Sequence, residues 1–206
     1  QLQKYIGNEG DIPRIHKMGG SDWRKAVTKT QKSIDDLADK LVELYAKREI
    51  TEGFAFLPDQ PWQQEFEDAF PYEETEDQLQ ATREIKESME RPTPMDRLLA
   101  GDVGFGKTEV AMRAIFKAVV SGKQVAVLVP TTVLAQQHYQ TFLNRFNPFG
   151  VKVDVLNRFR STAEKKEVLK GIENGSIDIL IGTHSLLNKK VKFKDLGFLV
   201  VDEEQR

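Results

Sequence analysis

Residues 101–108 read Gly101-Asp102-Val103-Gly104-Phe105-Gly106-Lys107-Thr108, a complete G-x-x-x-x-G-K-T phosphate-binding loop. An apolar run precedes the loop and a helical pattern follows it. Glycines let backbone N–H groups curl around phosphates, and a helix N-terminus adds the positive end of its dipole. We expect Lys107 to place its charge on the phosphates of a nucleotide and the Thr108 hydroxyl to ligate Mg²⁺. The alternative is a glycine-rich turn that carries Lys-Thr by chance, and the agreement of strand, loop and helix patterns argues against it.

Outward from this loop, short apolar runs alternate with amphipathic ones along the chain. The expected strands cover residues 97–100, 124–129, 151–156, 177–181 and 198–201. The expected helices cover residues 107–121, 132–146 and 161–174. Strands that alternate with helices of these lengths predict an α/β domain with a mostly parallel sheet and helices on both faces.

An acidic cluster follows the last of these strands. Phe198-Leu199-Val200-Val201 leads directly into Asp202-Glu203-Glu204-Gln205. P-loop folds place a Mg²⁺-holding aspartate at such a strand end, beside a carboxylate that can polarise water. We assign Asp202 to the metal and Glu203 to the general base or to water positioning. An acidic loop without a catalytic role is the alternative, and the presence of the phosphate-binding loop weighs against it.

The first hundred residues are organised differently. Residues 1–20 are rich in glycine and predict a turn-rich lead-in. Ser21 opens a helical spacing of apolar residues that lasts to about residue 50, and a long polar helix of this kind more often links two bodies than fills a core. Residues 53–62 contain two prolines between aromatic residues and predict an irregular segment. Acids far outnumber bases over residues 63–90, which is typical of solvated helices.

Composition restricts the class of protein further. Charged residues make up 30% and hydrophobic residues 39% of the 206, a soluble balance with no run long enough to span a membrane. With no cysteine and three scattered histidines, a zinc site is not expected. We expect a cytoplasmic protein. The net charge of −2 gives no hint of nucleic acid, so any DNA contact has to be local. The chain begins with Gln1 and ends directly after the acidic cluster, so we expect a fragment of a longer protein.

The order Asp-Glu-Glu-Gln resembles the second motif of superfamily 2 helicases and translocases rather than a nucleotide kinase. Upstream, Phe70 and Gln78 resemble the motif that reads adenine in that superfamily, which makes ATP with Mg²⁺ the implied cofactor. The segment Thr75-Glu76-Asp77-Gln78 equally fits a capping box at the start of a helix. Both roles for Gln78 remain open.

Two further segments resemble the DNA-backbone motifs of this superfamily. Pro130-Thr131-Thr132-Val133-Leu134-Ala135-Gln136 follows a strand and opens a helix, and Gly182-Thr183-His184 follows another strand. Helix N-termini with hydroxyl groups are suited to phosphates. The implied DNA-binding residues are Thr131, Thr132, Gln136, Gly182, Thr183 and His184. A threonine at such a position can also serve only as an N-cap. Arg158 and Arg160 could also contact DNA phosphates. So could a lysine run that is equally typical of a solvated surface, consisting of Lys189, Lys190, Lys192 and Lys194.

The sequence around these motifs is more specific than the superfamily motifs themselves. The runs FPYEETEDQ, MDRLLAGDVGFGKTEVAMRA, VAVLVPTTVLAQQH, DILIGTHSLL and VDEEQR resemble the family of bacterial transcription-repair coupling factors. That resemblance implies a RecA-like lobe at residues 51–206, a linking helix at 21–50 and the end of a polymerase-interaction region at 1–20. It implies translocation on double-stranded DNA, displacement of stalled RNA polymerase and recruitment of excision-repair proteins, mostly through regions outside this chain.

The resemblance also implies what this chain lacks. A second RecA-like lobe with an arginine finger is missing, so we expect weak ATP-Mg²⁺ binding and very slow hydrolysis by this chain alone, since an arginine finger contributes about 10³ to 10⁵ in rate. Three alternatives stay open: a helicase of branched DNA similar to RecG, a P-loop kinase or switch that never touches DNA, and a non-catalytic module whose working surface is the long helix.

Overall fold

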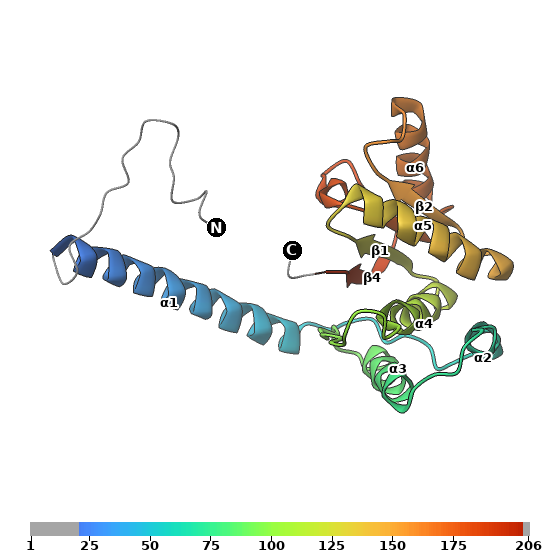
Figure 1. The fold of residues 1–206 in the computed structure, drawn as a ribbon, viewed down its shortest axis with the longest axis horizontal. Helices are drawn as coiled ribbons and strands as arrows, with labels where there is room; N and C mark the ends of the chain where they lie inside the picture. Colours follow the sequence, from blue (N-terminus) through green and yellow to red (C-terminus); the bar gives the residue numbers. More distant parts are fainter. Residues whose placement is uncertain (1–20, 204–206) are drawn as a thin grey trace. The chain divides into compact units, whose positions relative to one another are not determined.

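The computed structural model describes residues 21–203 and divides them into two units, with the boundary between Thr51 and Glu52. The expected lead-in at residues 1–20 and the end of the acidic cluster at 204–206 lie outside the described residues. The first unit is helix α1, Ser21–Ile50, which confirms the predicted long helix (Figure 1). Its apolar side chains are exposed, including Trp23, Leu37 and Tyr45. Among residues 21–203 no helix is long and apolar enough to cross a membrane.

The second unit is an α/β domain whose sheet has four parallel strands in the order β2-β3-β1-β4 (Figure 1). Its strands are β1 Gln124–Leu128, β2 Val153–Leu156, β3 Ile179–Gly182 and β4 Leu196–Val201. Its helices are α2 Pro61–Asp68, α3 Glu76–Met89, α4 Lys107–Val120, α5 Thr132–Phe146 and α6 Thr162–Asn174, with short 3₁₀ turns η2 Asn147–Phe149 and η3 His184–Leu187. These bounds confirm the predicted parallel sheet and the three helices that follow the phosphate-binding loop.

Helices cover both faces of this sheet because alternate strand residues point to opposite sides. Val125, Val127 and Ile181 belong to a large core that also includes buried residues of α4 and α5. Ala126 and Leu180 belong to a smaller core with residues of α6 and η3. The near-continuous apolar strands are therefore explained by burial on two sides.

One predicted strand does not form. Residues 97–100 have no regular secondary structure, although Leu99 packs against the main core. β1 is already paired on both sides, and although β4 has a free edge, residues 97–100 do not pair with it. Leu98 is 77% exposed, so this apolar run is neither hydrogen-bonded to a neighbouring strand nor fully buried. The predicted strand before the phosphate-binding loop is wrong for this structure.

Strand β4 lies at the edge of the sheet and keeps apolar side chains at the surface. Within residues 21–203 it pairs only with β1, and Leu196, Leu199 and Val201 are each about half exposed.

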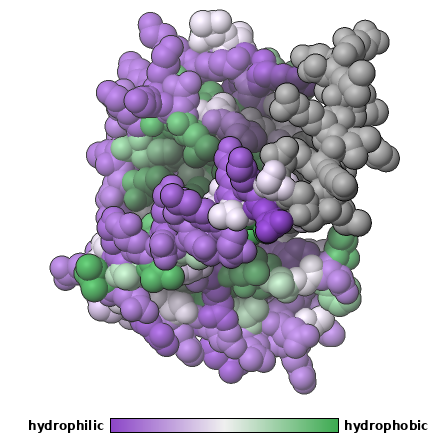
Figure 2. Space-filling model, turned by 90° about the vertical axis from the view of Figure 1, so that its left-hand side faces the viewer, coloured by the Kyte–Doolittle hydropathy of each residue, from purple (hydrophilic) through white to green (hydrophobic). Residues whose placement is uncertain are grey.

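Hydrophilic side chains cover most of the face drawn in Figure 2, with hydrophobic ones gathered in patches between them.

The irregular segment at 52–60 is fixed to α4 by a buried lysine. Lys117 is 2% exposed, and its ammonium donates to the carbonyl of Leu57 at 2.7 Å, to Asp59 at 2.8 Å and to Glu90 at 2.7 Å. Phe56 is buried in the core beside this contact. One cation thus joins the segment before α2, the end of α3 and the helix that follows the phosphate-binding loop.

Candidate functional site

The phosphate-binding loop turns into α4 at Gly106, where the backbone needs a glycine. Gly106 has φ +69°, which L side chains rarely adopt, and a Cβ there would lie 2.5 Å from Nε2 of Gln78. The Lys107 ammonium donates to the carbonyls of Gly101 at 2.6 Å and Asp102 at 2.7 Å. The loop is thereby closed around its own lysine at the N-terminus of a 14-residue helix.

A hollow of about 560 Å³ lies between the N-terminal end of α4, α3 and α5. Five of the predicted nucleotide residues line it together: Phe70, Gln78, Gly104, Gly106 and Thr108. Val103 and Phe105 of the same loop are exposed. The predicted residues from two distant segments of sequence therefore meet around one space.

Gln78 has one of the two roles that its sequence context left open, the capping of α3. Its Oε1 accepts from the backbone N–H of Thr75 at 2.9 Å, which completes the capping box of α3. Its Nε2 donates to the carbonyl of Phe105 at 2.9 Å. The amide therefore ties the start of α3 to the phosphate-binding loop. Reading of adenine by Gln78 stays a prediction.

The aromatic residue of the predicted adenine motif is held by a buried ion network. The Arg113 guanidinium lies 5.5 Å from the centre of the Phe70 ring and donates to Glu74 at 2.7 Å. That hydrogen bond lowers the pKa of the Glu74 carboxyl from its usual value. Arg113 is itself 2% exposed and also pairs with Glu109. The loop that carries Phe70 is thus anchored to α4.

The acidic end of β4 is held on both carboxylate oxygens. Asp202 Oδ1 accepts from the backbone N–H of Glu203 at 3.1 Å, and Oδ2 lies 2.7 Å from Nε2 of His138 on α5. Glu203 has φ +55°, a left-handed conformation that is uncommon for a residue with a Cβ. Such strain often occurs at functional sites.

The residues present fit a magnesium nucleotide. Mg²⁺ is usually bound by one or two carboxylates together with substrate phosphate oxygens, so a crowded protein cage is not needed. Within the described part of the chain no group of three or more histidine, cysteine, aspartate and glutamate side chains gathers as a metal site. The Thr108 hydroxyl lines the hollow, and Asp202 is joined to it through His138, which also lines the hollow.

A second hollow of about 640 Å³ lies at the carboxyl ends of β1, β2 and β3. Thr131, Thr132, Thr183 and His184 line it, so four of the six predicted DNA-binding residues share one groove. Thr131 also caps α5, accepting from the backbone N–H of Leu134 at 3.2 Å. Ligands collect at this edge of parallel sheets.

The other two predicted DNA residues have structural contacts. Gln136 accepts from Asn157 at 3.2 Å, and Asn157 in turn accepts from the backbone of Phe159 and Arg160. Gly182 is buried at the end of β3, where a Cβ would lie 2.9 Å from the carbonyl of Leu156. Neither of the two is among the residues that line the groove.

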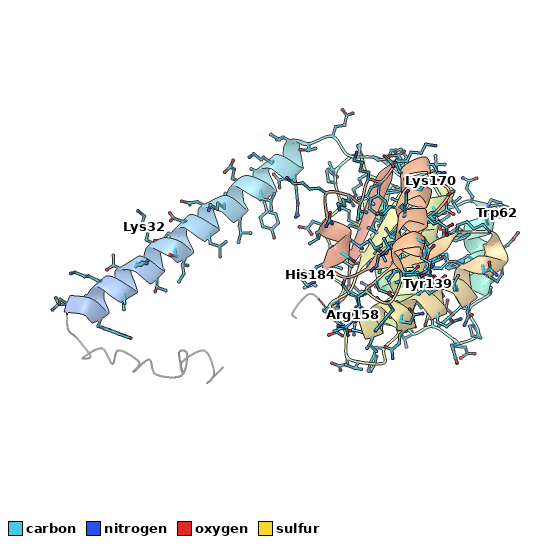
Figure 3. All side chains as sticks on the ribbon, turned by 90° about the horizontal axis from the view of Figure 1, so that it is seen from above. Lys32, Trp62, Tyr139, Arg158, Lys170 and His184 are labelled. Carbon is cyan, nitrogen blue, oxygen red and sulfur yellow. The ribbon has the colours of Figure 1, made fainter. Side chains whose placement is uncertain are left out.

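Cations enter the same groove from three segments. Arg158, Lys165 and Lys190 line it. Figure 3 shows Arg158 and His184 at one edge of the domain, with Lys170 of α6 away from them. Arg160 is instead paired with Asp154 at 2.5 Å. The two arginines weighed together from sequence thus have different surroundings.

Sequence reasoning missed Lys165 and His138. The spacing of Leu134, Gln137, His138 and Thr141 is i, i+3, i+4 and i+7, and all four line the nucleotide hollow. This helical period was the signal that could have placed His138 at the site. Lys165 carries no such signal, because only the packing of α6 brings it to the groove.

Known proteins match both the sequence and this arrangement. The profile of DEAD/DEAH box helicases matches residues 75–206, which include the phosphate-binding loop and the end of β4. The chain belongs to the DEAD/DEAH box helicase family. This membership makes the chain part of a helicase-family enzyme.

Relatives that match over the whole chain share one name. The chain is 58% identical over 206 residues to the transcription-repair-coupling factor of Bacillus subtilis (strain 168), and 54% identical to that of Staphylococcus haemolyticus. Each alignment covers the whole chain and 18% of the relative. A solved structure of RecG bound to a three-way DNA junction superposes with a TM-score of 0.75 at 38% identity, over 80% of this chain and 22% of that one. The chain thus spans about a fifth of the curated relatives it matches.

Proposed function

We propose that residues 52–203 belong to the ATP-binding lobe of a double-stranded-DNA translocase, which couples ATP hydrolysis to displacement of stalled RNA polymerase and recruitment of excision repair. The observation that carries this proposal is α5. Its capping Thr131 and its Thr132 line the cationic groove, and its His138 and Thr141 line the nucleotide hollow. A single helix therefore connects the two sites that a translocase has to couple.

In this proposal, Mg²⁺ supplies charge neutralisation and Lewis acidity at the phosphates when it is bound. Lys107 leaves the carbonyls of Gly101 and Asp102 and donates to phosphate oxygens. Thr108 and Asp202 would hold the metal. Glu203 would orient the attacking water and take its proton as the water oxygen bonds to the γ-phosphorus, and the bond to the β–γ bridging oxygen would break to release ADP. The N–H groups at the start of α4 stabilise the negative charge.

The proposal is tested by ATP turnover with and without duplex DNA, in a longer protein that carries this lobe. We expect DNA to stimulate turnover and Lys107→Ala to abolish it, since the substitution removes the phosphate-binding charge. We also expect the 206-residue chain alone to bind MgATP and to turn it over very slowly, because hydrolysis in such motors needs a second lobe. The proposal would be contradicted if duplex DNA did not change the rate of ATP turnover. It would also be contradicted if the 206-residue chain alone showed robust DNA-stimulated turnover.

The groove is proposed to hold the DNA backbone. Replacing Arg158, Lys165 or Lys190 by glutamine should weaken duplex binding for all sequences alike. The plot of log affinity against log salt has a negative slope, and its magnitude should decrease by roughly 0.9 for each lost phosphate contact. Fluorescence anisotropy with labelled duplexes, at several salt concentrations, measures both quantities. Lys170→Gln is the matched control, because it removes the same charge from α6 outside the groove. An equal loss in this control would mean diffuse attraction rather than a groove.

The structural likeness to RecG bound to a three-way junction supports a second candidate, a lobe of a branched-DNA helicase. The two are separated in the longer protein by polymerase pull-down and by fork unwinding. Polymerase capture without fork unwinding favours the coupling-factor function, and the reverse favours the helicase.

A further inference from the structure

His138 contacts the proposed metal ligand directly, although no motif used above assigns it a role. Its Nε2 lies 2.7 Å from Asp202 Oδ2, and their side chains are 14% and 36% exposed. An ionised carboxylate can only accept hydrogen bonds, so the Nε2 atom carries the proton. With Oδ1 held by the backbone N–H of Glu203, both oxygens of Asp202 are oriented by the protein.

The imidazole is well placed to orient this carboxylate because it is itself fixed. Its ring packs edge-on against Phe142 at 5.9 Å, and Phe142 is 2% exposed. Phe142 packs in turn against buried Phe146, one turn further along α5, with the two rings tilted by 32°. The orientation of His138 is therefore determined by the main core.

We propose that His138 is a positioning residue that holds the plane of the Asp202 carboxylate, so that its remaining lone pairs face the nucleotide hollow as Mg²⁺ ligands. This inference rests on the proposed function of Asp202. His138 lines that hollow together with Thr108, the other proposed oxygen ligand. A hydrogen-bonded carboxylate loses less rotational freedom on binding a metal, and partners of this kind often change metal affinity by roughly 10- to 100-fold.

The test compares His138→Ala, which removes the N–H, with His138→Gln, whose amide N–H has a similar reach from the backbone. Gln140→Ala is the control, because Gln140 is an exposed residue of the same helix that bonds only within α5, to Asn144. Mg²⁺ is titrated into the 206-residue protein with a fluorescent ATP analogue, and binding of the analogue is also measured in EDTA. Circular dichroism checks that each variant is folded.

We expect His138→Ala to raise the Mg²⁺ concentration at half-saturation by about 10-fold and to leave binding in EDTA unchanged. His138→Gln should recover most of the loss, and Gln140→Ala should match the wild type. An unchanged Mg²⁺ requirement in His138→Ala overturns the proposal, as does an equal loss in the alanine and glutamine variants. A matching loss in EDTA also overturns it, because His138 would then shape the hollow rather than the metal site. If the wild type shows no Mg²⁺-dependent binding, the proposed nucleotide function itself fails.

Discussion

Glu109→Ala is expected to lower the free energy of unfolding of the α/β domain by about 3 to 5 kcal/mol, the range for removing one partner of a buried ion pair. Glu109 accepts from Arg145 at 2.8 Å and from Arg113 at 3.2 Å. The side chains of the two arginines are only 12% and 3% exposed. Without Glu109, two desolvated guanidinium groups lose their shared counter-charge, which water cannot easily replace.

This loss is large because the network joins several elements. Arg145 also donates to the carbonyl of Phe66 in α2, and its guanidinium lies 3.8 Å from the centre of the Phe66 ring. Arg113 continues the network to Glu74, at the segment that carries Phe70. Glu109 therefore links α4, α5 and α2 and the loop before α3.

Urea unfolding followed by circular dichroism at 222 nm measures the effect. Glu87→Ala is the control, since Glu87 is an exposed glutamate of α3 and exposed substitutions usually change stability by less than about 0.5 kcal/mol. If Glu109→Ala and Glu87→Ala have the same unfolding midpoint, the buried network contributes nothing measurable.

Glu203→Gln is expected to reduce ATP turnover by roughly 10² to 10⁴, the usual contribution of a general base. Glutamine keeps nearly the same shape but cannot take a proton from water. The glutamine side chain takes the same left-handed backbone position, at φ +55°, so the backbone strain is unchanged by the substitution. Nucleotide affinity should therefore be retained, which separates chemistry from binding.

The measurement is single-turnover hydrolysis in a longer protein that carries the lobe, with duplex DNA present. Asp195→Asn is the matched control, because Asp195 precedes β4 at the opposite end of the strand and pairs with Lys123 at 2.8 Å. If the Glu203→Gln variant hydrolysed ATP as fast as the Asp195→Asn variant, Glu203 would not be the general base.

Periodicity predicted most of the fold because each element has a local pattern. The spacing of apolar residues placed α1, α4, α5 and α6 within one or two residues of their observed ends. The apolar run at 97–100 has the same local pattern as the true strands, but no free strand edge pairs with it. Strand formation requires a partner from elsewhere in the chain, and no local pattern reports whether that partner is present.

The candidate site divides in the same way. The phosphate-binding loop and the acid that follows β4 could be recognised because each is a motif of contiguous residues. The meeting of His138 with Asp202, the entry of Lys165 into the groove and the different surroundings of Arg158 and Arg160 were not evident. Each depends on which way a helix or loop faces after packing.

The sequence by itself determined that this chain has an α/β domain with a phosphate-binding loop and belongs among the helicases, because backbone geometry and phosphate chemistry demand particular residues at fixed local spacing. Only the tertiary structure decided which side chains orient Asp202, which cations face the groove and which carboxylate bridges Arg113 and Arg145. These contacts join residues far apart in the chain, and their energies depend on burial and distance, which arise only when the elements pack.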